Sequence, residues 1–256
     1  MKIIVSVKQV PARDSALRVH SSGNRLDAGD LSYEMNEPDA YALEEALQLK
    51  EKLGGEVIAL CAGPQRATQT IREALAKGAD RAIHVELAEG VELDALETGR
   101  LLAKAVQSES PDLILTGLQS DDMGYGQTGV IMAELLGFSH ATIVMEVTPE
   151  GGAVRVKREL EDGWFQNVVL PLPAVLTIQS GIKKLRYATL MGIKRAKTKE
   201  VKNLSAASLG VDLKPETITK RIYLPERSKT SQIFSGDARQ AAQKLVEKLR
   251  FEARVL

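Results

Sequence analysis

A glycine-rich polar loop, residues 117–129, carries the groups best suited to binding chemistry. Its four glycines are Gly117, Gly124, Gly126 and Gly129. The apolar run 113–115 predicts a buried strand before the loop, and the apolar spacing of 130–136 predicts a helix after it. This arrangement favours a bound phosphate, because glycines let the backbone come close and a helix N-terminus attracts negative charge. The alternative is an ordinary surface loop, because the spacing matches neither GxGxxG nor GxxxxGKS/T.

Groups that could perform catalysis are scarce elsewhere in the sequence. There are three histidines and one cysteine, and no Ser/His/Asp set, metal-spaced Cys/His cluster or paired acidic dyad emerges from their placement. We expect Cys61 to be a buried packing residue and His84, inside a predicted strand, to be structural. A nucleotide-holding partner subunit without catalytic residues of its own, and without a metal site, fits this composition better than a hydrolase does.

Composition narrows the class of protein. The chain has 256 residues with 34 basic and 34 acidic side chains, so it lacks the basic excess of generic nucleic-acid binding. A single cysteine fits a reducing compartment. No segment approaches the roughly 20 apolar residues of a membrane span, and the start, MKIIVSVKQV, reads as a strand instead of a signal peptide. We therefore expect a cytoplasmic protein that does not insert into membranes.

The elements that must position the loop alternate between strand and helix. Apolar β-branched runs predict strands at 2–7, 57–60, 81–85 and 113–115. Amphipathic patterns predict helices that end near Gly54, at 68–77, at 93–108 and at 130–136, the first of them capped by Asn36 or Asp39. This alternation predicts an α/β fold with a mostly parallel, doubly wound sheet. Ser6, at the carboxyl end of the first strand, could face a ligand there or be a simple strand-end hydroxyl.

An antiparallel extension follows the parallel part. Strands are expected at 142–147, at 153–160 and again at 168–178, with turns at Gly151–Gly152 and Gly163. Trp164, beside the second turn, is expected to be a packing residue. Residues 1–180 then form a nucleotide-binding α/β domain.

The composition changes after residue 180. Residues 181–203 are rich in lysine and arginine and enclose the apolar side chains of Tyr187, Leu190 and Met191, with Lys194 close by. A basic run is usually only a solvated face, but exposed apolar residues inside it favour a docking surface with a charged rim. Residues 204–235 have little periodicity and predict an extended arm, and 237–250 predict an amphipathic helix. Such a helix, at the end of residues 204–256, is expected to pack on another chain or domain.

Several segments in order resemble the beta subunit of electron transfer flavoproteins. They are residues 2–10 (KIIVSVKQV), 35–46 (MNEPDAYALEEA), 78–85 (GADRAIHV), the loop 117–129, 156–177 (VKRELEDGWFQNVVLPLPAVLT) and 186–194 (RYATLMGIK). The resemblance covers most of the chain. It implies an adenine-nucleotide-hydrolase-like fold and an obligate heterodimer with an alpha subunit that carries most of the FAD site. It also implies docking of acyl-CoA-type or other dehydrogenases and a membrane quinone oxidoreductase as acceptor.

By this resemblance the beta subunit binds a structural AMP. The residues implied are Ser6, Asn36, Glu37, Pro38, Asp39, Ala62, Gly117, Leu118, Gln119, Ser120, Asp121, Asp122, Met123, Gly124, Tyr125, Gly126, Gln127 and Thr128. The partner-docking residues implied are Tyr187, Leu190, Met191 and Lys194, with Leu190 as the anchor.

Some features depart from the family pattern. Gly124 and Gly126 replace larger residues of many relatives, and Glu37 separates Asn36 from Pro38. Electron-bifurcating relatives bind a second FAD in place of AMP. The loop text DDMGYGQTG resembles the AMP type at its Gln-Thr-Gly end, whereas VKQVP in the first strand resembles the bifurcating type. We favour AMP. A stand-alone nucleotide-binding regulator of the universal-stress type is a further alternative, but it has no use for the long tail after residue 180.

Overall fold

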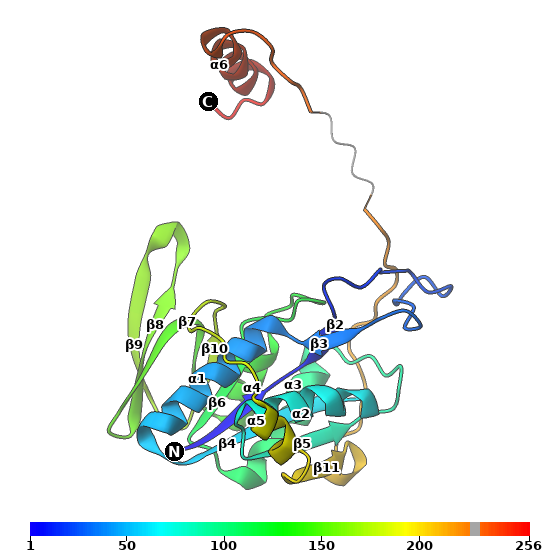
Figure 1. Ribbon diagram of the computed structural model, residues 1–256, viewed down its shortest axis with the longest axis vertical. Helices are drawn as coiled ribbons and strands as arrows, with labels where there is room; N and C mark the ends of the chain where they lie inside the picture. The colour runs from blue at the N-terminus through cyan, green and yellow to red at the C-terminus, as the bar shows by residue number, and fades with distance from the viewer. Residues whose placement is uncertain (226–230) are drawn as a thin grey trace. The chain divides into compact units, whose positions relative to one another are not determined.

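The computed structural model describes residues 1–225 and 231–256, which form two units (Figure 1). Unit 1 is Met1–Lys220 and unit 2 is Arg221–Leu256. Residues 226–230 of the predicted arm lie outside the described residues.

A nine-stranded sheet with the order β11-β5-β4-β1-β6-β10-β7-β8-β9 forms the centre of unit 1. Its strands are β1 (Lys2–Ser6), β4 (Glu56–Gly63), β5 (Arg81–Glu86), β6 (Leu113–Gly117), β7 (Ser139–Glu150), β8 (Ala153–Glu159), β9 (Phe165–Pro171), β10 (Ala174–Ile178) and β11 (Val201–Ser205). All pairs from β11 to β7 are parallel, and β7-β8 and β8-β9 are antiparallel. The four predicted parallel strands and the antiparallel extension are confirmed.

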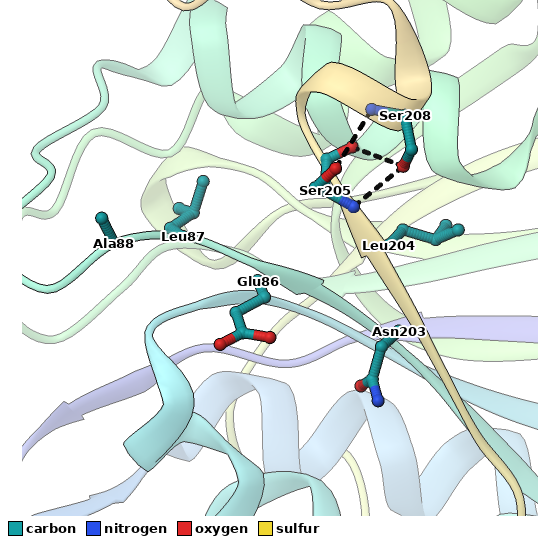
Figure 2. A pocket seen from close by; sticks show the side chains of 7 residues that line it. All are labelled: Glu86, Leu87, Ala88, Asn203, Leu204, Ser205 and Ser208. Carbon is teal, nitrogen blue, oxygen red and sulfur yellow. Dashed lines mark hydrogen bonds between the residues drawn. The ribbon is translucent and has the colours of Figure 1, made fainter.

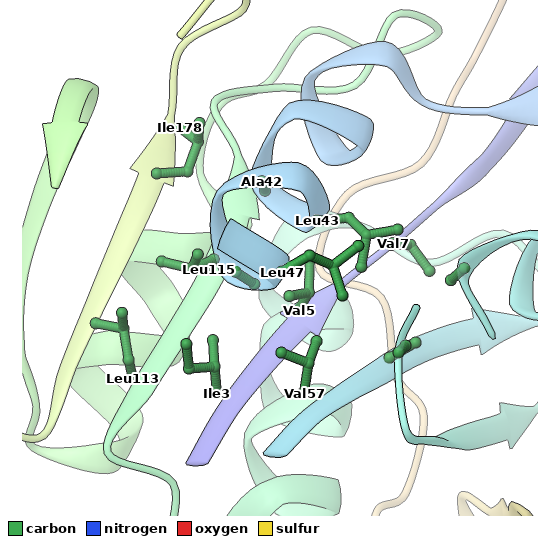
Figure 3. Close-up of a cluster of buried hydrophobic side chains, with 14 of the residues drawn as sticks. Ile3, Val5, Val7, Ala42, Leu43, Leu47, Val57, Leu113, Leu115 and Ile178 are labelled. Carbon is green, nitrogen blue, oxygen red and sulfur yellow. The ribbon is translucent and has the colours of Figure 1, made fainter. Parts of the chain in front are cut away.

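Four helices cover the two faces of the sheet. They are α1 (Glu37–Leu53), α2 (Thr68–Lys77), α3 (Ala95–Val106) and α4 (Thr128–Leu136). Ile3 and Val5 of β1 belong to the same buried cluster as Leu47 of α1 (Figure 3). Ile4, which points the other way, belongs to a second cluster with Leu101 of α3. Since alternate residues of one strand are buried on both faces, the sheet is doubly wound, as the sequence predicts.

The expected single strand 168–178 is wrong. Its residues divide at Leu172–Pro173 into β9, at the antiparallel edge of the sheet, and β10, which lies between β6 and β7. All five residues of β10 are buried, whereas β9 is mostly exposed. A continuous apolar run, AVLTI, is typical of a central parallel strand, and Pro173, which has no N–H to donate, separates it from the edge strand. Trp164 is also misjudged, because 71% of its surface is exposed.

Smaller elements complete unit 1. The strands β2 (Gln9–Pro11) and β3 (Tyr33–Met35) form a two-stranded antiparallel sheet. Short 3-10 turns are η1 (Gln65–Ala67), η2 (Gln107–Glu109), η3 (Glu161–Gly163) and η4 (Ala207–Leu209). The basic segment 181–203 contains α5 (Leu190–Ala196), a helix that sequence reasoning missed, and most of β11.

Unit 2 has a helix of its own, α6 (Ala238–Glu247), which continues as a π-helical turn, η5 (Lys248–Glu252). Asp237 caps α6 by accepting a hydrogen bond from the Gln240 N–H at 2.8 Å. The predicted terminal helix is therefore confirmed. None of its residues is buried, and the apolar side chains of Leu245, Val246 and Phe251 are exposed.

Candidate functional site

The glycine-rich loop lies at the topological switch point of the parallel sheet. Strand β1 has β4 on one side and β6 on the other, and the strand order runs outward from it in both directions. Ser6 ends β1, Ala62 lies near the end of β4, and Gly117 ends β6, so these three predicted residues meet at one sheet edge. Open α/β sheets bind ligands at this place, in the crevice beyond the carboxyl ends of the strands.

Asp39, in the first turn of α1, ties the two central strands together. Its Oδ1 accepts a hydrogen bond from the Gly117 N–H at 2.9 Å, and its Oδ2 accepts one from the Lys8 N–H at 2.8 Å. The side chain is buried. Burial raises the pKa of Asp39 to about 7, although the two backbone N–H groups favour the charged form. One carboxylate thus fixes where β1 ends relative to the start of the loop.

Asn36 holds the loop itself. Its Nδ2 donates to the Gln119 carbonyl at 2.9 Å, and its Oδ1 accepts from the Asp121 N–H at 2.9 Å. The side chain is only 1% exposed. Asn36 occupies the N-cap position of α1, but its side chain makes no cap hydrogen bond there. The expectation that Asn36 caps α1 through its side chain is therefore wrong, because that amide pairs with the loop backbone instead.

Close contacts explain two of the four glycines. A Cβ at Gly117 would lie 2.5 Å from Asp39 Oδ1 and 2.6 Å from the Cβ of Pro38. A Cβ at Gly129 would lie 2.7 Å from the Thr177 Cγ2, so glycine there lets α4 approach the sheet. Gly124 and Gly126 have φ values of +67° and +63°, a backbone conformation that favours glycine.

The loop leaves its outer part accessible. The Gly124 N–H donates to the Ser120 carbonyl at 2.8 Å and closes a turn. Met123 and Tyr125 are exposed, and Gln127 precedes α4 without a side-chain cap. The first N–H groups of α4, which begins at Thr128, therefore have no partner from that side chain and face the end of the loop.

Two basic side chains at the loop were missed by the sequence analysis. Lys8 Nζ lies 2.7 Å from Asp122 Oδ1 and 3.3 Å from Ser120 Oγ. Arg13 pairs with Glu37 and, at 3.3 Å, with Asp121 Oδ2. One signal in the sequence could have identified them. Both residues follow the first strand closely, where the chain leaves the sheet edge at which α/β proteins bind ligands. Each of these cations is paired with carboxylates of the loop or of the start of α1, so they offset the negative charge of the acidic side chains at this place.

Comparisons with known proteins identify the family. Residues 26–209 match the electron transfer flavoprotein domain. A Methylophilus methylotrophus protein named "Electron transfer flavoprotein subunit beta" is 38% identical over 254 residues, with 94% of this chain and 96% of that protein covered. This chain belongs to the electron transfer flavoprotein family. Proteins of the same name in Sus scrofa and, as a mitochondrial form, in Oryza sativa subsp. japonica are 38% and 34% identical over 258 and 259 residues, with 100% of this chain and 99% and 100% of those proteins covered.

The family match extends over most of the site. It includes Asn36, Asp39, the whole loop and α5, while β1 and α6 lie outside it and are covered by the full-length relatives. The family expected from the sequence is confirmed. Within this electron transfer flavoprotein chain, the structure brings together Ser6, residues 36–39, Ala62 and residues 117–128 at one sheet edge.

The predicted docking residues form a separate surface. Tyr187, Leu190, Met191 and Lys194 lie on and just before α5, which packs against α2 and not on the loop. Tyr187 and Leu190 are 92% and 81% exposed, and Met191 is exposed as well.

The remaining reactive groups have structural roles. Cys61 is buried, and burial raises the pKa of its thiol to about 12, so it is no nucleophile. His84 is buried with Nε2 3.0 Å from the Gly63 carbonyl, which agrees with the structural role expected for it. Within residues 1–225 and 231–256 no group of three or more His, Cys, Asp or Glu side chains could hold a metal ion. No helix in the described parts of the chain is long and apolar enough to cross a bilayer.

A pocket of about 460 Å³ opens at the carboxyl ends of β5 and β11 (Figure 2). It is lined by Glu86, Leu87, Ala88, Asn203, Leu204, Ser205 and Ser208. The two serines satisfy each other through three hydrogen bonds of 2.8 to 3.1 Å, so Glu86 and Asn203 are the polar groups left to face a ligand. None of the residues predicted from the sequence lines this pocket, which lies two strands away from β1.

Proposed function

We propose that this chain is the beta subunit of a heterodimeric electron transfer flavoprotein. It holds AMP as a structural ligand and helps to shield an FAD that is carried mainly by the alpha subunit. That flavin shuttles electrons from dehydrogenases to an acceptor oxidoreductase. The observation that supports AMP best is the pair of buried side chains, Asn36 and Asp39, that holds the glycine-rich loop open at the switch point.

The physical argument for an adenylate starts from the backbone. Asn36 and Asp39 fix the first part of the loop, and Gln127 gives the start of α4 no side-chain cap, so the first N–H groups of α4 are suited to hold a phosphate. Lys8 and Arg13 add positive charge beside them. The adenine and ribose would then lie along the edge formed by Ser6 and Ala62, whose side chains are small.

The rest of the proposal follows from the family and the second surface. We assign no catalytic residue to this chain, because Cys61 and His84 are held in structural roles. Partners are the alpha subunit, acyl-CoA-type or other dehydrogenases, and a membrane quinone oxidoreductase as acceptor. The exposed Leu190, with Tyr187 and Met191 beside it and Lys194 at the rim, would contact the dehydrogenase. We place the complex in the cytoplasm.

The test is the content of the native complex. The chain is co-purified with its alpha subunit, denatured, and the released small molecules are identified and counted by mass spectrometry and by the flavin absorbance. We expect one FAD and one AMP per heterodimer. Two FAD and no AMP would replace AMP by a second flavin, as in the bifurcating type. A stable monomer that ignores the alpha subunit in size-exclusion chromatography would overturn the subunit assignment and favour the stand-alone regulator.

A further inference from the structure

The chain between β10 and α5 crosses helix α1 and is held there by one arginine. The Arg186 guanidinium meets Glu44 through Nε–Oε2 at 2.8 Å and Nη2–Oε1 at 3.0 Å. The same guanidinium meets Glu51 through Nη1–Oε1 at 2.6 Å and Nη2–Oε2 at 3.3 Å. The Arg186 backbone N–H also donates to Glu44 Oε2 at 3.2 Å. Arg186 therefore makes two forked contacts with carboxylates two turns apart on α1, the geometry for which arginine is better suited than lysine.

The contact with Glu44 is well shielded from water. The Glu44 side chain is 5% exposed and that of Arg186 is 29% exposed. Burial by itself would raise the pKa of Glu44, but the Arg186 guanidinium outweighs it and holds the pKa below its ordinary value. A buried carboxylate left without this partner would be strongly destabilised, so the segment has one favoured position on α1.

Neighbouring side chains pin the same segment. Ile182 and Leu185 pack against the buried cluster below α1, and Lys183 Nζ lies 3.6 Å from Glu45 Oε2. Glu45 is buried, and its Oε2 has no hydrogen-bond partner among the described residues. By contrast, Lys184 is exposed and makes no ion pair within the described parts of the chain.

Helix α5 is fastened immediately after this segment. Thr189 caps it by accepting from the Gly192 N–H at 3.0 Å. Any Cβ at Gly192 would overlap the carbonyl oxygen of Ala76 in α2. At the other end, Arg72 Nη1 donates to the Ala196 carbonyl at 2.5 Å. Arg72 thus ties the C-terminal end of α5 to α2, whereas Leu190 lies at the N-terminal end, where the Thr189 cap is internal to the segment.

We propose that Arg186 is the positioning residue for partner docking: its forks to Glu44 and Glu51 hold the chain so that Leu190 stands in its docking position before a dehydrogenase arrives. This inference rests on the proposed docking function of α5. Leu190, the proposed anchor, lies only four residues after Arg186. If the backbone at Arg186 becomes mobile, the position of Leu190 therefore becomes less well defined. A pre-positioned anchor lowers the entropy lost on binding, so the effect falls on partner affinity and not on flavin chemistry.

The test compares variants in the intact complex with the alpha subunit, with an acyl-CoA dehydrogenase as electron donor. KM for the complex and kcat are measured for Arg186→Gln, Arg186→Lys, Leu190→Ala and Lys184→Gln. Lys184→Gln is the matched control, because it removes one positive charge from the same segment without removing an ion pair. We expect Arg186→Gln to raise KM about tenfold with kcat changed by less than about twofold, and Arg186→Lys to lie between it and wild type.

The outcomes separate this inference from the proposed function. If Leu190→Ala raises KM but Arg186→Gln behaves as Lys184→Gln does, the positioning role is overturned while docking by α5 stands. If Leu190→Ala itself leaves KM unchanged, the docking function fails. Hydrogen exchange of residues 189–196 provides a readout without a partner, and it should become faster in Arg186→Gln than in Lys184→Gln.

A milder variant guards against a folding defect. Glu51, with a side chain 60% exposed, supports only the outer fork, so Glu51→Gln should keep the fold and the flavin content. We expect it to raise KM by roughly two- to threefold, because the shielded fork to Glu44 stays intact. If Arg186→Gln does not fold and neither Glu51→Gln nor Arg186→Lys raises KM, the inference is overturned.

Discussion

Helix α1 supports the two regions to which we propose functions, and it holds them in different ways. At its N-terminal end, Asn36 and Asp39 hold the glycine-rich loop through buried hydrogen bonds of 2.8 to 2.9 Å to backbone groups. Further along, Glu44 and Glu51 hold the segment before α5 through ion pairs with Arg186, of which the Glu44 pair is shielded and the Glu51 pair is open to water. Buried hydrogen bonds to backbone are costly to break, whereas partly exposed ion pairs are screened by salt. The loop should therefore be the more rigid of the two regions.

The two regions also present opposite chemistry. The loop is mostly exposed, and its glycines at 124 and 126 leave the backbone accessible there, which suits a small anion of fixed shape. Helix α5 fixes its backbone and presents apolar side chains, 81% of Leu190 being exposed, which suits a larger protein surface. One helix thus positions the proposed ligand site and the proposed partner site, which do not share residues.

The largest effect is expected from Gly117→Ala, which would disturb the start of the glycine-rich loop. A Cβ there would lie 2.5 Å from Asp39 Oδ1 and 2.8 Å from the Asp39 backbone N, so either α1 or β6 must move. We expect a loss of about 3 kcal/mol or more in the free energy of unfolding of the complex, and loss of AMP.

The matched control is Gly137→Ala, at the C-cap of α4. Nothing lies within 4 Å of a Cβ there, and only its φ of +68° is unfavourable for alanine. It should cost about 1 kcal/mol and keep AMP. Chemical denaturation at fixed complex concentration and nucleotide counting check both variants, and equal AMP content in the two would contradict the close-contact argument.

Asp39→Asn should change how stability depends on pH. The pKa of Asp39 is raised from 3.8 to about 7, so between these values the folded chain keeps a proton that the unfolded chain has lost. The Asp39 contribution to stability is thus complete below the unfolded value and is lost as pH rises through the folded one, with a slope of at most about 1.4 kcal/mol per pH unit. Between about pH 5 and pH 7 the free energy of unfolding of the wild-type complex should fall by roughly 2 to 3 kcal/mol, and that of Asp39→Asn should not fall in this way.

The Asp39→Asn variant also loses a hydrogen bond, and the cost of that loss in stability does not depend on pH. Asparagine has one carbonyl oxygen for the two N–H groups of Lys8 and Gly117, so one of them loses its partner at a constant cost of about 1 to 3 kcal/mol. Urea unfolding of both complexes at several pH values checks the slope. A difference between them that is the same at all pH values would show that Asp39 stays ionised throughout.

Gly192→Ala tests the second region, helix α5. The new Cβ would overlap the Ala76 carbonyl oxygen, so α5 must shift away from α2. We expect KM for an acyl-CoA dehydrogenase to rise about fivefold with AMP and FAD content unchanged, because overpacking here costs about 1 kcal/mol or more and moves only the docking helix. Gly181→Ala is the control, because nothing lies within 4 Å of its Cβ and only its φ of +86° is unfavourable for alanine. Loss of AMP in Gly192→Ala would mean that the two regions are not separable.

The sequence predicts the parallel core well because that signal is local. Runs such as IIV in β1 and LIL in β6, each followed by polar or glycine residues, identify buried strands, and helix α2 has the predicted bounds. The position of β10 between β6 and β7 could not be predicted, since pairing between strands far apart in sequence leaves no local pattern. The extra helix α5 was hidden because its seven residues contain Gly192 and a single exposed apolar face.

The glycines of the loop predicted where the candidate site lies. The side chains that hold the loop could not be predicted from the sequence. Glycines reveal where the backbone must approach something, but they do not show which side chain approaches. That Asn36 pairs with Gln119 and Asp121, more than 80 residues away in the chain, depends on the fold alone. Lys8 was missed for the same reason, because its partners Ser120 and Asp122 also lie far away in the chain.

Lys8→Gln is expected to have the smallest effect on stability and still to distinguish the two regions. Lys8 is 42% exposed and pairs with Asp122 at 2.7 Å, and such pairs contribute little once solvent screening is counted. Stability should therefore hardly change, but removing the cation beside the loop should weaken AMP retention by about three- to tenfold, and more at low salt than at high salt. Arg155→Gln, which breaks the exposed pair with Glu150 on the antiparallel extension, is the control and should leave retention unchanged. Retention is measured as the AMP left after exhaustive dialysis of the complex. Since the Lys8 ammonium pairs with Asp122 and Ser120 of the loop, the dehydrogenase KM should not respond to its removal. A KM that rises in Lys8→Gln would show that the charge at the loop affects the docking helix.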